Sequence, residues 1–519
     1  MIFRSPHGEI SPPERSLTDF VLNESRVPSQ QKALIDLITG RVITYGELRE
    51  QVRRTAAGLA ALGMRKGDVV ALYAPNSPEF AIAFHGASRA GATLTPANPT
   101  NTPHELAHQL TDAGAKILIT TASLADKARA AIAESGRAID LITTDETPGL
   151  PSLASIGRDA DPPSINIEPA TDVAVLPYSS GTTGLPKGVM LTHRNLVVNL
   201  LQTEAAEQTG PHALVAVLPF FHIYGLMVIL NFGLRAGTTV VTLPRFEIEP
   251  FLKALQDWRI ELAHVVPPIA IALAKHPAVE HYDLRQLKTL FCAAAPLGPG
   301  IADAVQQRLN VAVKQGYGMT ETSPVTHYAD SLTPVRSGTV GRLVPSTECR
   351  IVAVDSGRDA AVDQPGEVWI RGPQVMKGYL NNPEATARTV DGEGWLRTGD
   401  IGIVDSEGYL TIIDRLKELI KVKGFQVAPA ELEALLLKHP RIADAAVIPV
   451  ADEECGEVPK ALVVRRGELT PEEVIAYVHE QVAHYKRLRH VAFVDAIPKS
   501  ASGKILRRVL VARERGDAG

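Results

Sequence analysis

Residues 69–89 read VVALYAPNSPEFAIAFHGASR. The apolar run Val69 to Tyr73 predicts a buried strand, the Pro and Asn that follow predict a turn, and Glu79 to Arg89 predicts a helix. The same alternation recurs outward along the chain, in apolar runs at residues 116–120, 173–177, 239–243 and 262–266 that each precede a polar or helical stretch. Strands that alternate with helices are typical of βα units, so the sequence predicts an α/β fold with parallel-rich sheets flanked by helices.

The pattern changes twice toward the C-terminus. From Gly338, glycine-punctuated strands at residues 348–354, 366–370, 401–404 and 409–413 predict a small β subdomain over about 338–413. After Asp414, helices that start with acidic residues and two further strands predict a separate small α+β domain. We therefore expect a large N-terminal domain at residues 1–413, a hinge at 414–417 and a C-terminal domain at 418–519.

Composition narrows the function classes. The chain has 519 residues, a net charge of -5, 45% hydrophobic residues and three cysteines. This length implies at least two domains, and the near-neutral charge argues against a nucleic-acid partner, which would require a basic excess. Cys292, Cys349 and Cys455 are odd in number and far apart, which excludes a disulfide framework and a cysteine zinc site.

No segment predicts export or a membrane span. The N-terminus lacks the basic-then-apolar order of a signal peptide, and residues 516–519 are neither a peroxisomal nor a lipidation signal. Residues 213–234 carry no charge and are long enough to span a bilayer, but Pro219, His222, Gly225 and Asn231 interrupt them. We expect a buried core element there, and a cytoplasmic protein that is a monomer or a homodimer.

A glycine-rich loop lies between two of the expected strands. Residues 178–188 read YSSGTTGLPKG, with three glycines, four Ser or Thr side chains and one lysine. Backbone N–H groups, hydroxyls and a cation together are what a polyphosphate requires. The loop is not a Walker A sequence, because Pro186 precedes Lys187 and Gly188 follows it. We expect it to bind the phosphates of a nucleotide.

Four further motifs follow the loop in order. They are YGMTE at residues 317–321, GWLRTGD at 394–400, DRLKELIKVKGF at 414–425 and PKSASGK at 498–504. With the loop, this ordered set resembles the acyl-adenylate-forming superfamily of acyl-CoA synthetases, amino-acid adenylation domains and firefly luciferase. The resemblance extends from Thr44 almost to the C-terminus.

The resemblance implies an ATP-dependent acid–thiol ligase. A carboxylate is a poor electrophile, so members of this superfamily first join it to ATP as an acyl-AMP with release of pyrophosphate, and then pass the acyl group to coenzyme A. The family is described as rotating its C-terminal domain about a hinge between the two steps, so we expect that domain to be mobile.

The matching positions imply contacts to the nucleotide. Thr182, Thr183 and Lys187 match residues that hold the β- and γ-phosphates, while Thr320 matches a contact to the α-phosphate. Glu321 matches a carboxylate that binds Mg²⁺. Asp400 and Arg415 match groups on the ribose hydroxyls. The remaining positions that the resemblance assigns to ATP or coenzyme A are Ser179, Ser180, Gly181, Gly184, Ala294, Ala295, Pro296, Gln315, Gly316, Tyr317, Gly318, Met319, Ile412 and Gln426.

Two lysines are assigned to separate half-reactions by the same resemblance. Lys504 matches the lysine that reaches between the carboxylate and the α-phosphate during adenylation, and Lys421 matches one that serves the thioester step. Lys417 falls at the hinge. Lys423 and Gly424 match the edge of the tunnel for the pantetheine arm of coenzyme A.

The acyl pocket is expected to resemble that of 4-coumarate–CoA ligases, including bacterial ones. Residues 220–226 lack the aspartate that holds an ammonium group in amino-acid-activating members. By resemblance Tyr224 and Lys288 flank the phenolic end of a hydroxycinnamate, and a lysine at the blind end of an apolar pocket would select a ring hydroxyl. His222 is assigned to the catalytic set, as a base or as a gate beside the acyl pocket. The other pocket positions are Val228, Phe291, Ala294, Gly318, Pro324 and Val325.

Several alternatives stay open at this point. Phe291 and Val228 would narrow the pocket, which leaves a shorter aryl acid as a possible substrate. A medium-chain fatty acyl-CoA synthetase, a ligase that delivers acyl-AMP to a carrier-protein thiol and a luciferase-like oxygenase of an acyl-adenylate are the competing activities.

Overall fold

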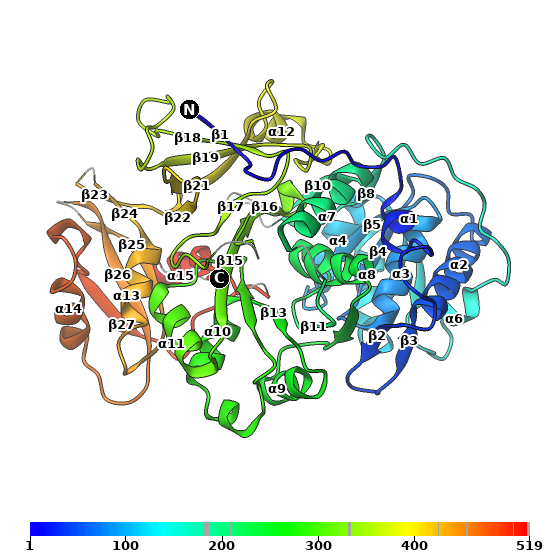
Figure 1. The fold of residues 1–519 in the computed structure, drawn as a ribbon, viewed down its shortest axis with the longest axis horizontal. Helices are drawn as coiled ribbons and strands as arrows, with labels where there is room; N and C mark the ends of the chain where they lie inside the picture. The colour runs from blue at the N-terminus through cyan, green and yellow to red at the C-terminus, as the bar shows by residue number, and fades with distance from the viewer. Residues whose placement is uncertain are drawn as a thin grey trace.

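The structure is a computed structural model that describes residues 1–179, 186–207, 210–330, 334–423, 425–452, 455–501 and 503–515. Three sheets with their helices form the larger part, a fourth sheet lies beside them, and a fifth belongs to the C-terminal part (Figure 1). The expected α/β class, with parallel-rich sheets, a small β-rich region and a small α+β C-terminal region, is confirmed. The domain boundaries remain predictions.

The first sheet is built around strand β4 (Val69–Tyr73), all of whose residues are buried. Parallel to it run β5 (Thr93–Ala97), β6 (Ala115–Thr120), β7 (Asp140–Thr143) and β8 (Val173–Val175). Three antiparallel strands complete the sheet: β9 (Tyr178–Ser179), β10 (Lys187–Thr192) and β20 (Gly378–Tyr379). Its main helices are α2 (Tyr45–Ala61), α3 (Pro78–Arg89), α4 (Pro103–Ala113), α5 (Ala125–Ser135) and α7 (His193–Glu207).

Helix α3 starts where the sequence predicts. The Ser77 side chain accepts the Phe80 N–H, and Pro78 occupies the first turn, where its missing N–H costs nothing. The βα unit predicted at residues 69–89 is therefore present.

Two further sheets complete the larger part. The second contains β11 (Ala213–Ala216), β12 (Thr239–Thr242), β2 (Lys32–Asp36) and β3 (Val42–Thr44). The third contains β13 (Leu262–Val265), β14 (Thr289–Cys292), β15 (Ala312–Gly318), β16 (Val325–Tyr328) and β17 (Arg342–Leu343). The helices here are α1 (Leu17–Val21), α6 (Leu153–Ile156), α8 (Phe232–Ala236), α9 (Ile248–Asp257), α10 (Pro267–Lys275) and α11 (Pro299–Leu309).

The uncharged stretch at residues 213–234 is a buried core segment, as expected. It forms strand β11, a turn, the π-helix η2 (Tyr224–Asn231) and the start of α8, and it packs in the largest apolar cluster. Among the described residues, no helix combines the length and the apolar character that a bilayer crossing requires.

The β-rich region includes one strand that the sequence did not predict. Its sheet has the order β1 (Ile2–Arg4), β18 (Glu348–Val352), β19 (Gly366–Arg371), β21 (Leu396–Val404) and β22 (Leu410–Arg415). Strand β1 comes from the N-terminus and pairs antiparallel with β18. Helix α12 (Pro383–Thr389) precedes β21.

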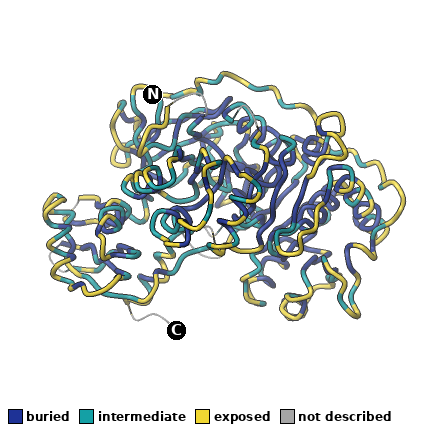
Figure 2. Tube along the Cα trace, turned by 60° about the horizontal axis from the view of Figure 1, so that its bottom comes forward, coloured by how far each residue is buried: buried dark blue, intermediate teal, exposed yellow. Residues whose placement is uncertain are grey.

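The C-terminal part has its own apolar cluster, around Ile420, Leu432 and Val463. Its elements are β23 (Ile420–Val422), β24 (Phe425–Val427), α13 (Pro429–Leu436), β25 (Ile442–Asp452), β26 (Gly456–Arg465), α14 (Pro471–His479), β27 (His490–Phe493) and α15 (Arg507–Arg515). Buried segments of the chain gather in the interior, and exposed segments lie mainly along the periphery (Figure 2).

Candidate active site

Strands β9 and β10 flank the glycine-rich loop. Ser179 pairs with Lys187 and Tyr178 with Gly188, so the two ends of the loop are held together in the sheet. The predicted phosphate ligands Ser180, Gly181, Thr182, Thr183 and Gly184 lie outside the described residues.

Glu321 lies beside the foot of this loop, in the short helix η4 (Thr320–Thr322) that follows β15. The side chain is 6% exposed, and its Oε1 accepts hydrogen bonds from Ser179 Oγ at 3.1 Å and from Tyr379 Oη at 2.9 Å. The Lys187 ammonium lies 4.9 Å from the centre of the Tyr379 ring. Both donors use Oε1, and no hydrogen bond to Oε2 is found among the residues that the structure describes, so Oε2 can take a further ligand.

Asp400 and Arg415 are cross-strand partners at the edge of β21 and β22. Arg415 Nε lies 3.2 Å from Asp400 Oδ1, and Tyr317 Oη donates to Asp400 Oδ2 at 2.6 Å. Burial and the Asp400 carboxylate raise the pKa of Tyr317 well above its ordinary value, so Tyr317 stays a neutral donor. The Asp400 side chain is thus an acceptor held in place beside a guanidinium, which suits a sugar diol.

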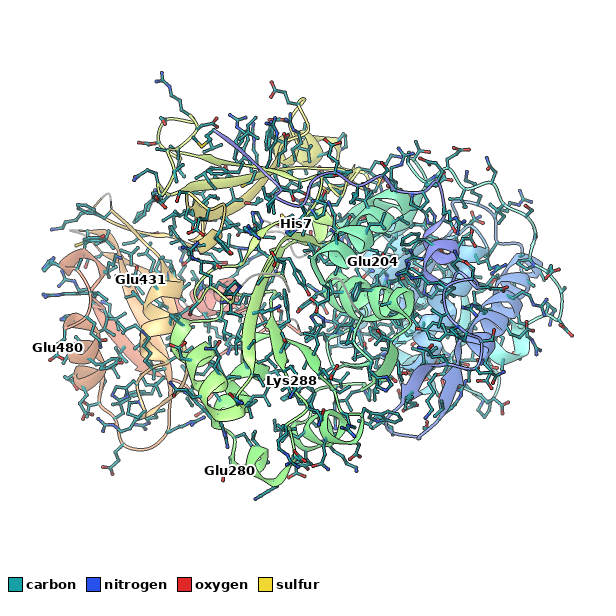
Figure 3. The ribbon with its side chains drawn as sticks, viewed as in Figure 1. His7, Glu204, Glu280, Lys288, Glu431 and Glu480 are labelled. Atoms are coloured by element: carbon teal, nitrogen blue, oxygen red, sulfur yellow. The ribbon has the colours of Figure 1, made fainter. Side chains whose placement is uncertain are left out.

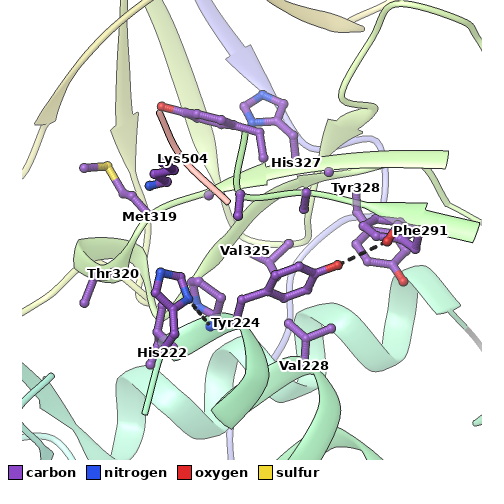
Figure 4. A pocket seen from close by; sticks show the side chains of 17 residues that line it. His222, Tyr224, Val228, Phe291, Met319, Thr320, Val325, His327, Tyr328 and Lys504 are labelled. Carbon is purple, nitrogen blue, oxygen red and sulfur yellow. Dashed lines mark hydrogen bonds between the residues drawn. The ribbon is translucent and has the colours of Figure 1, made fainter. Parts of the chain in front are cut away.

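A cavity opens next to these groups. Met319, Thr320, His222 and Lys504 lie at one end of it, and Val228, Phe291 and Tyr328 lie at the other (Figure 4). Further lining residues are Ile223, Tyr224, Ala293, Ala294, Gly316, Tyr317, Gly318, Pro324, Val325 and His327. Its aromatic end suits a ring, and its polar end suits a charged reacting group.

Lys504 reaches this cavity from the C-terminal part. Its loop packs against the larger part, since a Cβ on Gly503 would lie 2.9 Å from Pro268 Cδ. Burial, together with the charge of Arg415, lowers the pKa of Lys504. The lysine is therefore placed where a negative substrate group would stabilise its charge.

His222 is held in one orientation by the backbone. Its Nδ1 accepts the Tyr224 N–H at 3.2 Å, which leaves the imidazole proton on Nε2. Burial, with a smaller effect from Lys504, lowers the pKa of His222 to about 3. A neutral imidazole with its proton on Nε2 fits a gate or a hydrogen-bond donor better than the base that the sequence also allowed.

Comparison with known proteins decides the family. The family model described as "AMP-binding enzyme" matches residues 23–380, and the one described as "AMP-binding enzyme C-terminal domain" matches residues 431–504. The chain belongs to the AMP-binding enzyme family. The predicted membership in the acyl-adenylate-forming superfamily is confirmed.

This AMP-binding enzyme also has full-length curated relatives. It is 44% identical to 4-coumarate--CoA ligase 5 of Oryza sativa subsp. japonica over 530 residues, which cover 99% of the chain and 97% of the relative. It is 45% identical to 4-coumarate--CoA ligase 1 of Petroselinum crispum, with the same coverage. The AMP-binding enzyme is an acid–thiol ligase that uses ATP and coenzyme A as substrates.

Two solved structures resemble the whole AMP-binding enzyme. The ATP-bound MatB from Rhodopseudomonas palustris has a TM-score of 0.88 and 29% identity, covering 97% of this chain and 99% of that one. The anthranilate CoA ligase AuaEII, solved with anthranoyl-AMP, has a TM-score of 0.88 and 25% identity, covering 97% and 98%.

The AMP-binding enzyme brings only some of its predicted residues to the cavity. Lys421 is exposed on β23, with its backbone N–H bonded to Glu457, and Lys417, Lys423 and Gln426 are exposed as well. None of these four lines the cavity. Gly424 lies outside the described residues.

The stretch that contains Ala294, Ala295 and Pro296, which is predicted to contact the nucleotide, is held by Gln315. Gln315 Oε1 accepts the Leu297 N–H at 3.2 Å, which fixes the turn that contains Ala294, Ala295 and Pro296. Ile412 is partly buried in the adjoining β-rich region.

The prediction for Lys288 is wrong. The Lys288 side chain, labelled in Figure 3, is exposed, its ammonium donates to the Arg285 carbonyl at 2.9 Å, and it does not line the cavity. Lys288 precedes β14, whereas the cavity is lined from Phe291 onward, toward the other end of that strand.

Sequence reasoning missed Tyr379 and His264. Tyr379 is far from Glu321 in sequence, and nothing in its local pattern marks it as a partner of that carboxylate. His264 had a signal, because it is a histidine within the otherwise apolar run of β13.

Proposed function

We propose that this ligase acts on hydroxycinnamic acids such as 4-coumarate, or on closely related aryl acids. The observation that carries the proposal is the aromatic cavity that ends at Lys504. Tyr224, Phe291 and Tyr328 supply flat apolar surface at the closed end, while the cation lies at the reacting end. The near full-length identity to curated 4-coumarate–CoA ligases supports the same substrate class.

Adenylation follows from this placement. A carboxylate oxygen of the acid attacks the α-phosphorus of ATP, the bond from that phosphorus to the β-phosphate bridge breaks, and pyrophosphate leaves. Negative charge spreads over the phosphoryl oxygens in the transition state. The Lys504 ammonium would offset that charge, and the Thr320 hydroxyl would donate a hydrogen bond to a phosphoryl oxygen. Lys187 and the glycine-rich loop would hold the leaving phosphates, and Asp400 would orient the ribose.

Mg²⁺ fits the same set of residues. Glu321 is a buried carboxylate whose Oε1 is fixed by two donors, and Mg²⁺ needs few protein ligands because it keeps water and phosphate oxygens. We infer that Glu321 holds the ion through its other oxygen. When bound, Mg²⁺ supplies charge neutralisation on the phosphates.

The second step requires a different arrangement. The thiol sulfur of coenzyme A attacks the acyl carbon, the carbon–oxygen bond to AMP breaks, and AMP leaves. Lys421 would serve this step, and it is outside the cavity in the present orientation, which therefore corresponds to adenylation. Rotation about Lys417 would exchange the two lysines. The monomeric or dimeric state, the cytoplasmic location and the lack of a nucleic-acid partner stay predictions.

A shorter aryl acid is the second candidate. The Phe291 and Tyr328 rings stack at 4.3 Å and close the cavity, which shortens the space beyond Tyr224. The resemblance to a ligase solved with anthranoyl-AMP is compatible with such an acid.

Pyrophosphate release across a panel of cinnamic, benzoic and fatty acids tests the proposal. We expect the highest kcat/KM for 4-coumarate or another hydroxylated cinnamate. Lys288→Leu should leave the ranking unchanged, because that side chain is exposed. A preference for fatty acids, or release only in the presence of a carrier protein, would contradict the proposal.

A further inference from the structure

The closed end of the acyl cavity contains a tyrosine hydroxyl whose proton is already donated in a hydrogen bond within the protein. Tyr224 is 7% exposed, lines the cavity and points its hydroxyl toward Phe291 and Tyr328 (Figure 4). That hydroxyl lies 3.2 Å from His264 Nδ1 and 3.4 Å from the Phe291 carbonyl oxygen. Burial raises the pKa of Tyr224 well above its ordinary value, so the group is a neutral hydroxyl with one proton.

His264 lies behind this hydroxyl, in the wall rather than in the cavity. Strand β13 pairs it with Phe291 of β14, and its ring stands edge-on to Tyr224 with 5.8 Å between the ring centres. The side chain is 1% exposed, and burial lowers its pKa to about 3, so the imidazole is neutral. Its Nε2 is buried and has no hydrogen-bond partner among the residues that the structure describes.

In either tautomer of the neutral His264 imidazole, the Tyr224 hydroxyl proton points away from the cavity, toward His264 or the Phe291 carbonyl. If His264 carries its proton on Nε2, Nδ1 accepts from Tyr224. If the proton is on Nδ1, His264 donates to the Tyr224 oxygen, and Tyr224 donates to the Phe291 carbonyl. In both cases the Tyr224 oxygen faces the cavity only as an acceptor.

The other hydroxyl at this end is also occupied. Tyr328 Oη lies 2.8 Å from Glu207 Oε2, on the side of helix α7. The remaining neighbours, Val228, Phe291 and Val325, present apolar atoms to the cavity. A substrate that ends in a hydrogen-bond donor would thus be paired, and one that ends in an acceptor would leave two acceptors facing each other without a proton.

We propose that His264, through Tyr224, makes the closed end of the cavity an obligate acceptor that selects aryl acids with a distal hydroxyl or amino donor. This inference rests on the proposed function. His264 is a positioning residue, because it touches Tyr224 and not the substrate. His264 thus accounts for the selection of a ring hydroxyl, which the resemblance had implied for Lys288.

The test compares three acids that differ only at the ring position farthest from the carboxylate: 4-coumarate, cinnamate and 4-methoxycinnamate. In the unaltered enzyme we expect 4-coumarate to have the highest kcat/KM and 4-methoxycinnamate the lowest. In His264→Phe the Tyr224 hydroxyl can turn into the cavity and donate. The ratio of kcat/KM for 4-coumarate to that for 4-methoxycinnamate should fall about tenfold, the factor of one hydrogen bond, mainly through KM.

Two further variants separate a polar role from a packing role. His264→Gln keeps an acceptor near Tyr224 and should restore most of the ratio. His85→Phe is the matched control, because His85 is equally buried, its Nε2 has no hydrogen-bond partner in the described part of the chain, and it does not line the cavity. It should leave the ratio unchanged even if it lowers stability. Should His264→Phe fail to fold, Tyr224→Phe should bring kcat/KM for 4-coumarate down to that for cinnamate.

The possible failures are distinguishable. An unchanged ratio in His264→Phe, or an equal loss for all three acids, would overturn the role of His264 while leaving the proposed function intact. Activity of the unaltered enzyme on fatty acids but on none of the three aryl acids would overturn the proposed function, and this inference with it.

Discussion

At the scale of single residues, the site depends on carboxylates whose orientation is fixed by neutral hydroxyls. Glu321 accepts from Ser179 and Tyr379, and Asp400 accepts from Tyr317. Such donors fix the direction in which each carboxylate points, as the residues behind a metal or ligand site commonly do.

Tyr379→Phe tests this arrangement at Glu321. The ring that contacts Lys187 remains, but one donor to Oε1 is lost, so the carboxylate can rotate. We expect the Mg²⁺ concentration for half-maximal pyrophosphate release to rise roughly three- to tenfold, with little change at saturating Mg²⁺. Tyr178→Phe is the control, because Tyr178 donates to Asp112 instead. Equal Mg²⁺ curves for Tyr379→Phe and the unaltered enzyme would contradict this role.

At the scale of elements, helix α13 of the C-terminal part is seated against α10 and α11 of the larger part. A Cβ on Gly298, the residue before α11, would lie 3.1 Å from Ala434 Cβ in α13. Lys275, at the end of α10, donates to the Leu437 carbonyl at 3.4 Å, at the C-terminal end of α13. These contacts join the C-terminal part to the larger part in the orientation in which Lys504 lines the cavity.

Gly298→Leu should therefore impair adenylation in particular. The larger side chain would force α11 and α13 apart and disfavour the orientation in which Lys504 reaches the cavity. We expect acyl-AMP formation to slow roughly tenfold, an effect of about 1.4 kcal/mol, while thioester formation from supplied acyl-AMP changes less. Gly392→Leu serves as the control, because a Cβ there meets no atom within 4 Å. Equal losses in both half-reactions would speak against an orientation effect.

At the same scale, residues within motifs could be singled out from the sequence, whereas contacts between distant segments could not. Glu321, Asp400, Arg415 and Lys504 each lie in a motif that carries the family resemblance, so the sequence singled them out, and their roles stay predictions. Lys288 was misplaced because it lies just before the exposed start of β14, three positions before Phe291, which lines the cavity. The pairings of Tyr379 with Glu321 and of β1 with β18 join distant segments and leave no periodic signal.

At the scale of the whole molecule, five histidines with strongly lowered pKa values make stability depend on pH. Burial lowers the pKa of His85, His222, His264 and His327 to about 3, and that of His193 to about 4. In the unfolded chain each would titrate near its ordinary value of 6.5. Below that pH the unfolded state binds more protons, so the free energy of unfolding should fall as the pH decreases.

Asp414 has the opposite effect on the pH dependence of the free energy of unfolding. Burial raises its pKa to about 6, so the folded state binds a proton that the unfolded state lacks between about 4 and 6. One such group offsets only part of the effect of five histidines. As the pH is lowered from 7.5 to 5, the urea concentration at the midpoint of unfolding should fall. A midpoint that stays constant or rises as the pH is lowered would contradict this account.

The central claim is that one nucleotide site uses Lys504 to form the acyl-AMP and Lys421 to release it as a thioester. The most direct measurement assays both half-reactions separately in Lys504→Ala and Lys421→Ala. We expect Lys504→Ala to lower acyl-AMP formation by about a hundredfold or more and to spare thioester synthesis from supplied acyl-AMP, and Lys421→Ala to do the reverse. Equal losses of both half-reactions in either variant would contradict the claim.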